Sequence, residues 1–419
     1  MRLAIISSRK LYDYVLDTIE KHPSLDMTPF CIADWRKPMR DVFRGIPLIG
    51  LSALKAQDFD AVLVTVSNPH RMNEIVLKLH ERQFSNVYIV RLFPLAMRAD
   101  FLDANGFNLD YVDRLNLIED TFLAHVESLV CDHCNLNCKS CGAFSPFVHT
   151  KHIANIEQYA SDMERLSKLF STISVVNLLG GEPLLEPDLA VDMSRIAREY
   201  YPNSDLRILT NGILVPSMKP EFWDKLNKLH ASVEVTVYPA VFPNLPKIEE
   251  TLLNAGVAYR IAKVNTFGRW LLAEPHGNEV FNNDQCMCSG CHFLRDGHLA
   301  KCGTAWLMGY LAPAIGREPE EFRTRDAIDL YADDLDAWEV LRKLTGPADI
   351  CGQCAWNRIE QHDWEPVRHF PPDPGDWLLD DAEKQDGNTG QEDHVPRNLV
   401  PDGAYYATFR KTVQTNSGK

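Results

Sequence analysis

The sequence predicts an α/β protein of several domains: a parallel sheet with helices on both faces, a partial barrel of strand–helix repeats, and a small cysteine-rich unit. The chain has 419 residues, enough for two or three domains of ~100–200 residues each. Strand-like and helix-like segments alternate along most of it, as they do in parallel sheets covered by helices. Ten of the eleven cysteines fall in three groups, at 131–141, 286–302 and 351–354. Grouped thiols in a reducing compartment predict metal or redox chemistry.

Composition excludes two classes of partner. The chain carries 43 basic and 58 acidic residues, a formal net charge of −15. Binding to nucleic acid needs basic surface, so we expect no nucleic-acid partner. No apolar stretch approaches the ~18 residues of a membrane helix, and the N-terminus has too short an apolar run for a signal peptide. We therefore expect a cytoplasmic protein with no membrane partner.

Residues 1–97 are predicted to form the doubly wound sheet. Strands are expected at 3–6, 60–66 and 87–89, and helices at 11–21 and 69–82. The turn after the first strand, Ile6-Ser7-Ser8-Arg9-Lys10, has no glycine, which argues against tight dinucleotide binding. The layout, including GIPLIGLSAL, resembles the N-terminal Rossmann-like domains of bacterial nucleotide-sugar and surface-polysaccharide enzymes. A helical connector is expected at 98–126.

Residues 127–285 are predicted to form the partial barrel. Strands are expected at 127–130, 174–178, 206–210, 233–237 and 258–264, and helices at 153–170, 188–201, 220–229 and 245–255. In such folds the chemistry lies at the C-terminal ends of the strands. The first cysteine group and the GGEP and TNG segments all fall at those ends. Residues 286–370 are expected to form the cysteine-rich unit, and the acidic tail at 371–419 to be largely disordered.

The first cysteine group places three thiols, Cys134, Cys138 and Cys141, on one short loop. Three thiolates can hold a 4Fe-4S cluster and leave one iron open for another ligand. A zinc site that adds Cys131 is an alternative, because zinc accepts four thiolates. A ferredoxin-type site would use a different spacing.

The spacing Cys-x3-Cys-x2-Cys resembles that of the radical S-adenosylmethionine (SAM) superfamily. The segment Gly180-Gly181-Glu182-Pro183 resembles the GGEP motif of that family, and Asn211 lies in a TNG segment at the end of the third strand, as in the family. The resemblance implies a 4Fe-4S cluster on the three cysteines and a bound SAM, with Glu182 accepting a bond from the methionine ammonium. A structural turn is the alternative for GGEP. Ser140 departs from the family, which usually has an aromatic residue there, but its backbone can still bond the adenine.

The fourth predicted strand has an alternating pattern. Its valines would face the outer helices, which leaves Glu234, Thr236 and Tyr238 toward cofactor and substrate as candidate catalytic residues. A solvent-exposed polar face is the alternative.

The later cysteines predict a second metal site. Asp296-Gly297 signals a hairpin, with Cys302 just after it and Cys351-x2-Cys354 further on. This pattern resembles the shortened SPASM, or twitch, region of radical SAM enzymes, which implies an auxiliary 4Fe-4S cluster on four thiolates. Cys286 and Cys291 are the candidates for the fourth ligand, and the sequence does not decide among Cys286, Cys288 and Cys291. A zinc ribbon is the structural alternative.

The resemblance implies an iron–sulfur oxidoreductase or epimerase that cleaves SAM reductively and removes a hydrogen atom from its substrate. We expect a sugar or cyclitol substrate, possibly nucleotide-linked, and an electron donor such as flavodoxin or ferredoxin. A peptide-modifying maturase and a non-enzymatic, metal-stapled interaction protein are the alternatives.

Overall fold

The computed structural model describes residues 1–34, 41–66, 68–91, 101–286 and 288–380. They fall into two compact units. The first comprises residues 1–125, 167–175 and 334–345, and the second takes the rest of the described chain. In the described residues, no helix is long and apolar enough to cross a membrane.

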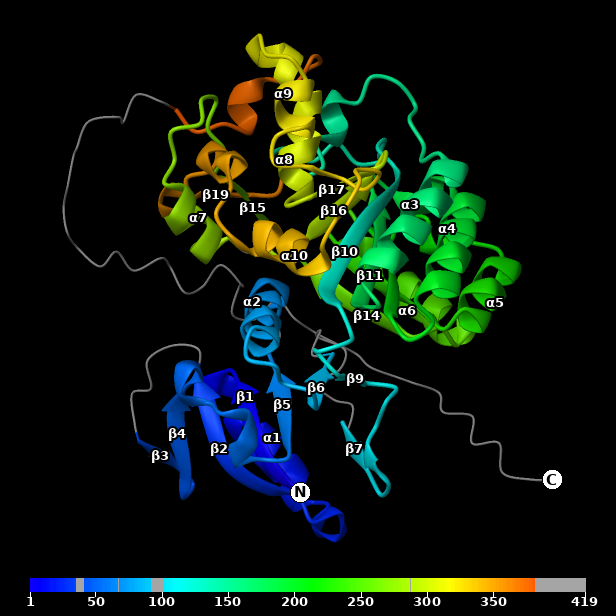
Figure 1. The fold of residues 1–419 in the computed structure, drawn as a ribbon. Helices are drawn as coiled ribbons and strands as arrows, with labels where there is room; N and C mark the ends of the chain where they lie inside the picture. The colour runs from blue at the N-terminus through cyan, green and yellow to red at the C-terminus, as the bar shows by residue number, and fades with distance from the viewer. Residues whose placement is uncertain (35–40, 67, 92–100, 287, 381–419) are drawn as a thin grey trace. The chain divides into compact units, whose positions relative to one another are not determined.

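The first unit is built on a seven-stranded sheet of order β3-β4-β2-β1-β5-β6-β9 (Figure 1). Its strands are β1 (Arg2–Ser7), β2 (Thr28–Asp34), β3 (Val42–Phe43), β4 (Ile46–Gly50), β5 (Ala61–Thr65), β6 (Val87–Val90) and β9 (Val112–Leu115). Its helices are α1 (Tyr12–Glu20), α2 (Pro69–His80) and α10 (Ala337–Thr345). The central strand β1 pairs in parallel with β2 and β5.

Alternate residues of β1 join two different cores. Leu3 and Ile5 pack with the apolar side of α1, whereas Ala4 and Ile6 pack with that of α2. The sheet is therefore covered on both faces, which confirms the doubly wound prediction. The predicted strands and helices at 3–6, 11–21, 60–66, 69–82 and 87–89 all have counterparts, while β2, β4 and β9 were not predicted.

The predicted helical connector at 98–126 is wrong over its described residues, 101–126. The chain there forms the short hairpin β7 (Leu102–Asp103) and β8 (Gly106–Phe107), then β9, then the start of β10 (Phe122–Cys131). Strand β9 lies antiparallel to β6 at the sheet edge. Pairing with an existing edge overrides the weak helical pattern of this segment.

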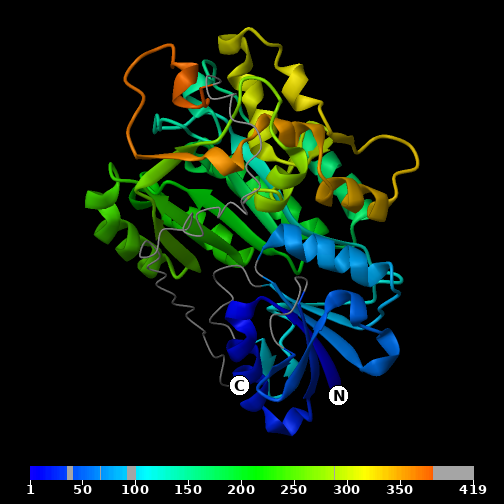
Figure 2. The ribbon, with the colours of Figure 1, turned by 90° about the vertical axis from the view of Figure 1, so that its left-hand side faces the viewer.

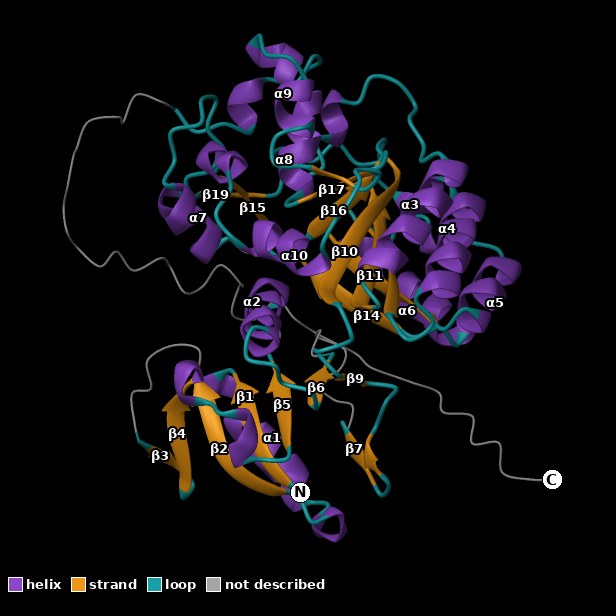
Figure 3. Ribbon diagram, viewed as in Figure 1, coloured by secondary structure: helices purple, strands orange, loops and turns teal. Residues whose placement is uncertain are grey.

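The second unit is built on an eight-stranded sheet of order β14-β13-β12-β11-β10-β16-β17-β18 (Figures 2 and 3). Its strands are β10, β11 (Thr172–Gly180), β12 (Asp205–Thr210), β13 (Ala231–Val237), β14 (Tyr259–Lys263), β16 (His292–Arg295), β17 (His298–Ala300) and β18 (Ile328–Asp329). The helices between the first five strands are α3 (Ile156–Leu169), α4 (Pro187–Tyr200), α5 (Pro220–Lys228) and α6 (Leu245–Ala255). They lie along the outer face of the sheet in Figure 3, and the strand–helix alternation predicted for 127–285 is confirmed.

The hairpin predicted at Asp296-Gly297 is confirmed, and its first strand extends the sheet. Asp296 and Gly297 have positive φ of 48° and 82°, as a tight two-residue turn requires. Strand β16 pairs in parallel with β10 and antiparallel with β17. The cysteine-rich region is thus joined directly to the sheet that carries the first cysteine loop.

The remaining elements complete the cysteine-rich region. They are α7 (Glu279–Gln285), α8 (Gly303–Leu307), α9 (Glu320–Arg323), β15 (Thr266–Arg269) and β19 (Glu360–Asp363). Strands β15 and β19 pair with each other in antiparallel fashion. The prediction that the tail from residue 371 is disordered is wrong for 371–380, because Trp377, Leu378 and Leu379 are buried. The rest of that prediction, 381–419, lies outside the described residues.

Candidate functional site

The loop after β10 brings the sulfurs of Cys134, Cys138 and Cys141 together. Burial, together with negative charge on neighbouring cysteines, raises the pKa of the Cys134 and Cys138 thiols to about 12. Burial also raises the pKa of Cys141. Cys138 is buried, and Cys134 and Cys141 are half-buried. Three such sulfurs repel one another as thiolates and would be stabilised by a bound metal, since only the thiolate is a metal ligand. This donor set fits a cluster held by three cysteines.

Two glycines let the GGEP segment approach the start of this loop. A Cβ at Gly180 would lie 2.3 Å from the backbone oxygen of Cys131, and one at Gly181 would lie 2.2 Å from that of His133. Instead, the Gly181 amide donates to Cys131 O at 2.8 Å. Only glycine permits this close packing of two backbones. GGEP is therefore part of the same site as the cysteine loop.

Glu182 is fully buried, with 0% of its surface exposed. Its carboxylate accepts from Thr210 Oγ1 at 2.6 Å, from the Asn211 amide at 2.8 Å and from the Leu184 amide at 3.0 Å. Burial raises the pKa of Glu182. A carboxylate has about four acceptor positions, so roughly one remains for a ligand. Pro183 begins the short 3-10 helix that follows.

Asn211 connects the end of β12 to the cysteine loop. Its side-chain amide donates to Asn135 Oδ1 at 2.7 Å and lies 3.7 Å from Cys134 Sγ. Gly212 has a φ of 84° and packs against Val235. The structure therefore gathers the predicted Glu182 and Asn211 around Cys134.

Ser140 is buried and sits in a left-handed conformation, with a φ of 55°. Its hydroxyl donates to the backbone oxygen of Asp376 at 2.6 Å and lies 2.7 Å from His362 Nε2. Ser140, where the family usually has an aromatic residue, is thus hydrogen-bonded to residues far along the chain. No local sequence pattern predicts these contacts of Ser140 with the expected auxiliary unit and tail.

The three candidate catalytic residues of β13 lie in different surroundings. The valines of this strand are buried, and two of them pack near Gly212. Glu234 lies 3.1 Å from Arg207 Nη1 and 2.5 Å from Arg260 Nη2, so its carboxylate serves an ion-pair network. Thr236 is half-buried.

Tyr238, just beyond β13, lies near the cysteine loop. Burial raises the pKa of its phenol, and negative charge on Cys134, Cys138, Cys141 and Glu182 raises it further. Its ring lies 5.4 Å from that of Phe267. A catalytic role for Glu234, Thr236 or Tyr238 stays a prediction, and Tyr238 has the most suitable surroundings.

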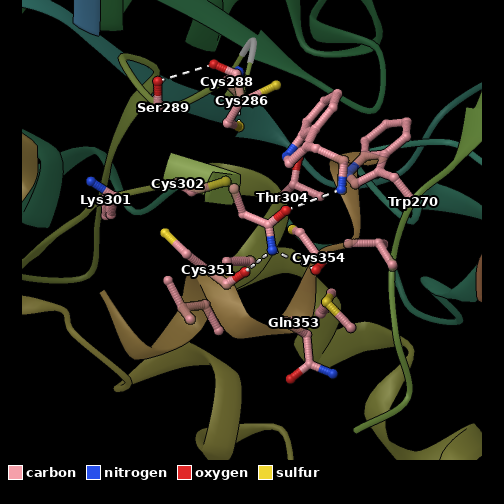
Figure 4. A pocket seen from close by; sticks show the side chains of 16 residues that line it. Trp270, Cys286, Cys288, Ser289, Lys301, Cys302, Thr304, Cys351, Gln353 and Cys354 are labelled. Carbon is pink, nitrogen blue, oxygen red and sulfur yellow. Dashed lines mark hydrogen bonds between the residues drawn. The ribbon is translucent and has the colours of Figure 1, made fainter. Parts of the chain in front are cut away.

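The later cysteines line a cavity (Figure 4). Cys286 and Cys288 lie on one side of it, and Cys302, Cys351 and Cys354 lie on the other. Its volume is about 40 Å³, above the ~10–15 Å³ that one water needs. Burial raises the pKa of the Cys302 thiol to about 12. Asn282 positions the later pair by donating to the backbone oxygens of Cys351 and Cys354 at 3.0 and 2.6 Å. These donors fit a second cluster held by four thiolates.

Cys291, a predicted ligand, is not among the described residues that line this cavity. Its thiol bonds to Cys288 and to the half-buried Glu127. Burial raises the pKa of Glu127 to about 7. The structure therefore places Cys286 and Cys288 at the cavity and Cys291 beside it. The C-x-C-x2-C spacing alone does not separate these three.

Lys301 is a buried cation at the same cavity. Burial lowers the pKa of its ammonium, and negative charge on Cys351, Cys302 and Cys286 opposes that shift. The ammonium donates to Gly346 O at 2.7 Å. A fixed positive charge beside several thiolates offsets part of their mutual repulsion.

The comparisons with known proteins agree with this geometry. The model of the radical SAM superfamily matches residues 128–239. A GTP 3′,8-cyclase of Nautilia profundicola is 35% identical over 89 residues, which is 21% of this chain and 27% of that protein. The chain thus spans about a quarter of the length of that curated relative.

Two solved structures show a partial likeness. BtrN in complex with AdoMet and 2-DOIA is 20% identical, with a TM-score of 0.33 over 56% of this chain and 94% of that one. Native anSMEcpe with bound AdoMet is 17% identical, with a TM-score of 0.28 over 34% of this chain and 45% of that one.

The family assignment rests on the sequence match together with the cysteine loop and the GGEP and TNG segments. Radical SAM proteins use a 4Fe-4S cluster and SAM, and the later cysteines of this chain are consistent with an auxiliary cluster. This chain therefore contains a radical SAM domain, at residues 128–239.

Proposed function

We propose that this chain is an iron–sulfur enzyme that removes a hydrogen atom from a sugar or cyclitol, possibly nucleotide-linked, and thereby dehydrogenates or epimerises it. The observation that carries the proposal is that three cysteine sulfurs lie together beside Glu182 and Asn211, at the C-terminal ends of β10, β11 and β12. When bound, the cofactors supply the reductive cleavage of SAM to methionine and a 5′-deoxyadenosyl radical, with the electron coming from a flavodoxin- or ferredoxin-type donor.

The chain's own residues would bind the cofactors, orient the substrate and shield both from water. Cys134, Cys138 and Cys141 would hold the cluster, and the remaining acceptor position of Glu182 would take the methionine ammonium. Asn211 fixes the loop that carries Cys134. Tyr238 would line the space between cofactor and substrate. Four of the five cavity cysteines would hold an auxiliary cluster, which would supply an electron acceptor for the substrate.

The sugar class is supported by the first unit and by the cysteine-lined cavity. The first unit is a doubly wound parallel sheet, like the domains of nucleotide-sugar enzymes that its sequence resembles. Peptide-modifying radical enzymes often begin with a winged-helix domain, and the described residues of the first unit form no such domain. A peptide substrate is the competing outcome of the experiment below.

The cofactor part of the proposal is tested on anaerobically reconstituted protein. We expect about eight irons from two 4Fe-4S clusters and formation of 5′-deoxyadenosine with dithionite. Joint replacement of Cys134, Cys138 and Cys141 by alanine should leave about four irons and abolish SAM cleavage. One zinc with about four irons would contradict the auxiliary cluster and leave the radical domain standing.

The substrate part is tested by deuterium transfer. Full-length enzyme is incubated with uniformly deuterated nucleotide sugars and cyclitols and, separately, with deuterated peptides. We expect deuterium in 5′-deoxyadenosine from at least one sugar or cyclitol and none from peptides, measured by mass spectrometry. Transfer from peptides alone would overturn the sugar assignment.

A further inference from the structure

The segment 360–379, which we call the C-terminal strap, lies along the first cysteine loop. The Lys139 amide donates to Glu365 O at 3.0 Å, and the Val367 amide donates to Asn137 O at 2.7 Å. Cys138 and Pro366 form an antiparallel bridge between these bonds. The strap is thus held to the loop by backbone pairing on both sides of Cys138.

Side chains fasten the strap at further points. The Lys139 ammonium lies 3.1 Å from Glu365 and 2.9 Å from Asp376. The indole of Trp377 donates to the backbone oxygen of Cys141 at 2.9 Å. These contacts fix the position of the strap relative to the loop.

The strap places one indole against a sulfur. Trp364 Nε1 donates to Cys138 Sγ at 3.1 Å, and the backbone amide of Trp364 is fixed by Asn265 O at 2.7 Å. Cys138 is 6% exposed, so little water competes for its sulfur. The bond lowers the pKa of the Cys138 thiol, against the larger effect of burial.

We infer that Trp364 raises the reduction potential of the cluster held by Cys134, Cys138 and Cys141, through its N–H bond to the Cys138 sulfur. The inference rests on the proposed function. A one-electron donor of low potential adds one electron to the cluster, and no covalent bond changes. The added negative charge resides partly on the sulfurs, so a donated N–H stabilises the reduced state more than the oxidised state. Low local dielectric strengthens this difference.

The test is an EPR-monitored redox titration of full-length, reconstituted protein. Trp364→Phe keeps an aromatic ring but removes the N–H. At a fixed potential we expect about a tenfold lower ratio of reduced to oxidised first cluster, which is a midpoint ~59 mV lower for one electron. Iron content should equal that of the unmodified protein.

Trp377→Phe is the matched control, because its indole donates to a backbone oxygen of the same loop and not to a sulfur. The midpoint of this variant should stay unchanged. Equal midpoints in Trp364→Phe and the unmodified protein would overturn the inference, as would the same shift in both variants.

A second variant covers the case in which Trp364→Phe does not load iron. Placing 3-benzothienylalanine at position 364 keeps the bicyclic ring and lacks only the N–H. It should load normally and show the lower midpoint. Loss of the first cluster from both variants would show that Trp364 holds the cluster in place, which overturns a role in tuning. A chain that forms no SAM-responsive cluster even without substitution would overturn the proposed function instead.

Discussion

In the proposed function, the Glu182 carboxylate both holds the site together and binds SAM. Three protein donors already fill most of its acceptor positions. If its remaining position binds the methionine ammonium, loss of the charge-assisted bond in Glu182→Gln should cost ~1.5–3 kcal/mol. That corresponds to roughly 10- to 150-fold weaker binding of SAM, measured by anaerobic equilibrium dialysis with iron content as the check.

The control for Glu182 is Thr210→Val. It removes one of the internal bonds to the same carboxylate but keeps the negative charge, so SAM affinity should change by only a few-fold. If Glu182→Gln loses no more affinity than Thr210→Val, the carboxylate is a structural acceptor that only positions Asn211.

The lining of the auxiliary cavity predicts which of the later cysteines are cluster ligands, a question that the sequence leaves open. Cys302→Ala removes a sulfur that lines the cavity, so we expect loss of about four irons, those of one 4Fe-4S cluster. Cys291 lies beside the cavity against Glu127, so Cys291→Ala should retain about eight irons. Iron and sulfide analysis after reconstitution measures the cluster content of both variants. Loss of iron in Cys291→Ala would make Cys291 a ligand.

Sequence predicts residues best where chemistry requires a fixed spacing. Cys134, Cys138 and Cys141 lie in one short loop, and the two glycines and Glu182 lie at one strand end, so their proximity could be predicted. Trp364 and His362 could not, because their contacts with Cys138 and Ser140 span more than 220 residues. No local sequence pattern predicts that the indole of Trp364 donates a hydrogen bond to the sulfur of Cys138.

At the scale of elements, the segment that follows β11 packs closely against the backbone of the cysteine loop. A methyl group at Gly181 would meet the His133 carbonyl at 2.2 Å, so the loop must move in Gly181→Ala. We expect this variant to lose about four irons, those of the first cluster, and to keep the auxiliary cluster.

Gly142→Ala is the control for this prediction, because it lies in the same loop. A Cβ there would meet only Thr304 Oγ1, at an ordinary 3.7 Å. It should reconstitute like the unmodified protein. Full iron content and unchanged SAM cleavage in Gly181→Ala would show that the two backbones can separate without cost to the site.

Elements with strong local patterns were predicted well, and those that depend on neighbours were not. Helix α6 ends at Gly256, which has a φ of 65°, and its predicted bounds are those observed. In contrast, β10 is buried along nearly its whole length. A fully buried strand shows no alternation of apolar and polar residues, so part of it was assigned to a helical connector.

At the scale of the whole molecule, the first unit includes residues distant in sequence. Helix α10, at 337–345, packs within this unit against α2. The Trp338 ring stacks on His80, with 3.7 Å between centroids. The sequence suggested that residues 1–97 form a separate unit. Deleting them would strip α10 and β9 of their partners, so the role of this unit is better tested in the full chain.

The first unit has the sheet of a dinucleotide-binding fold, but one feature that binds a dinucleotide is missing and another is occupied by protein contacts. The turn after β1 has Ser7-Ser8-Arg9 in place of glycines, which blocks close approach of a pyrophosphate. Asp34, at the end of β2, stands where such folds bind a ribose hydroxyl. Its carboxylate instead accepts from Arg9 Nε at 2.9 Å and from Tyr12 at 3.3 Å.

We therefore expect no NAD binding by the full-length chain up to about 1 mM, a free energy weaker than ~4 kcal/mol, measured by isothermal titration calorimetry. Arg9→Ala frees one acceptor position of Asp34 but leaves the serine turn in place, so it should not restore binding. If Arg9→Ala gains affinity, the ion pair and not the turn is the barrier. A micromolar affinity in the unmodified chain would make the first unit a cofactor domain and would remove its support for a sugar substrate.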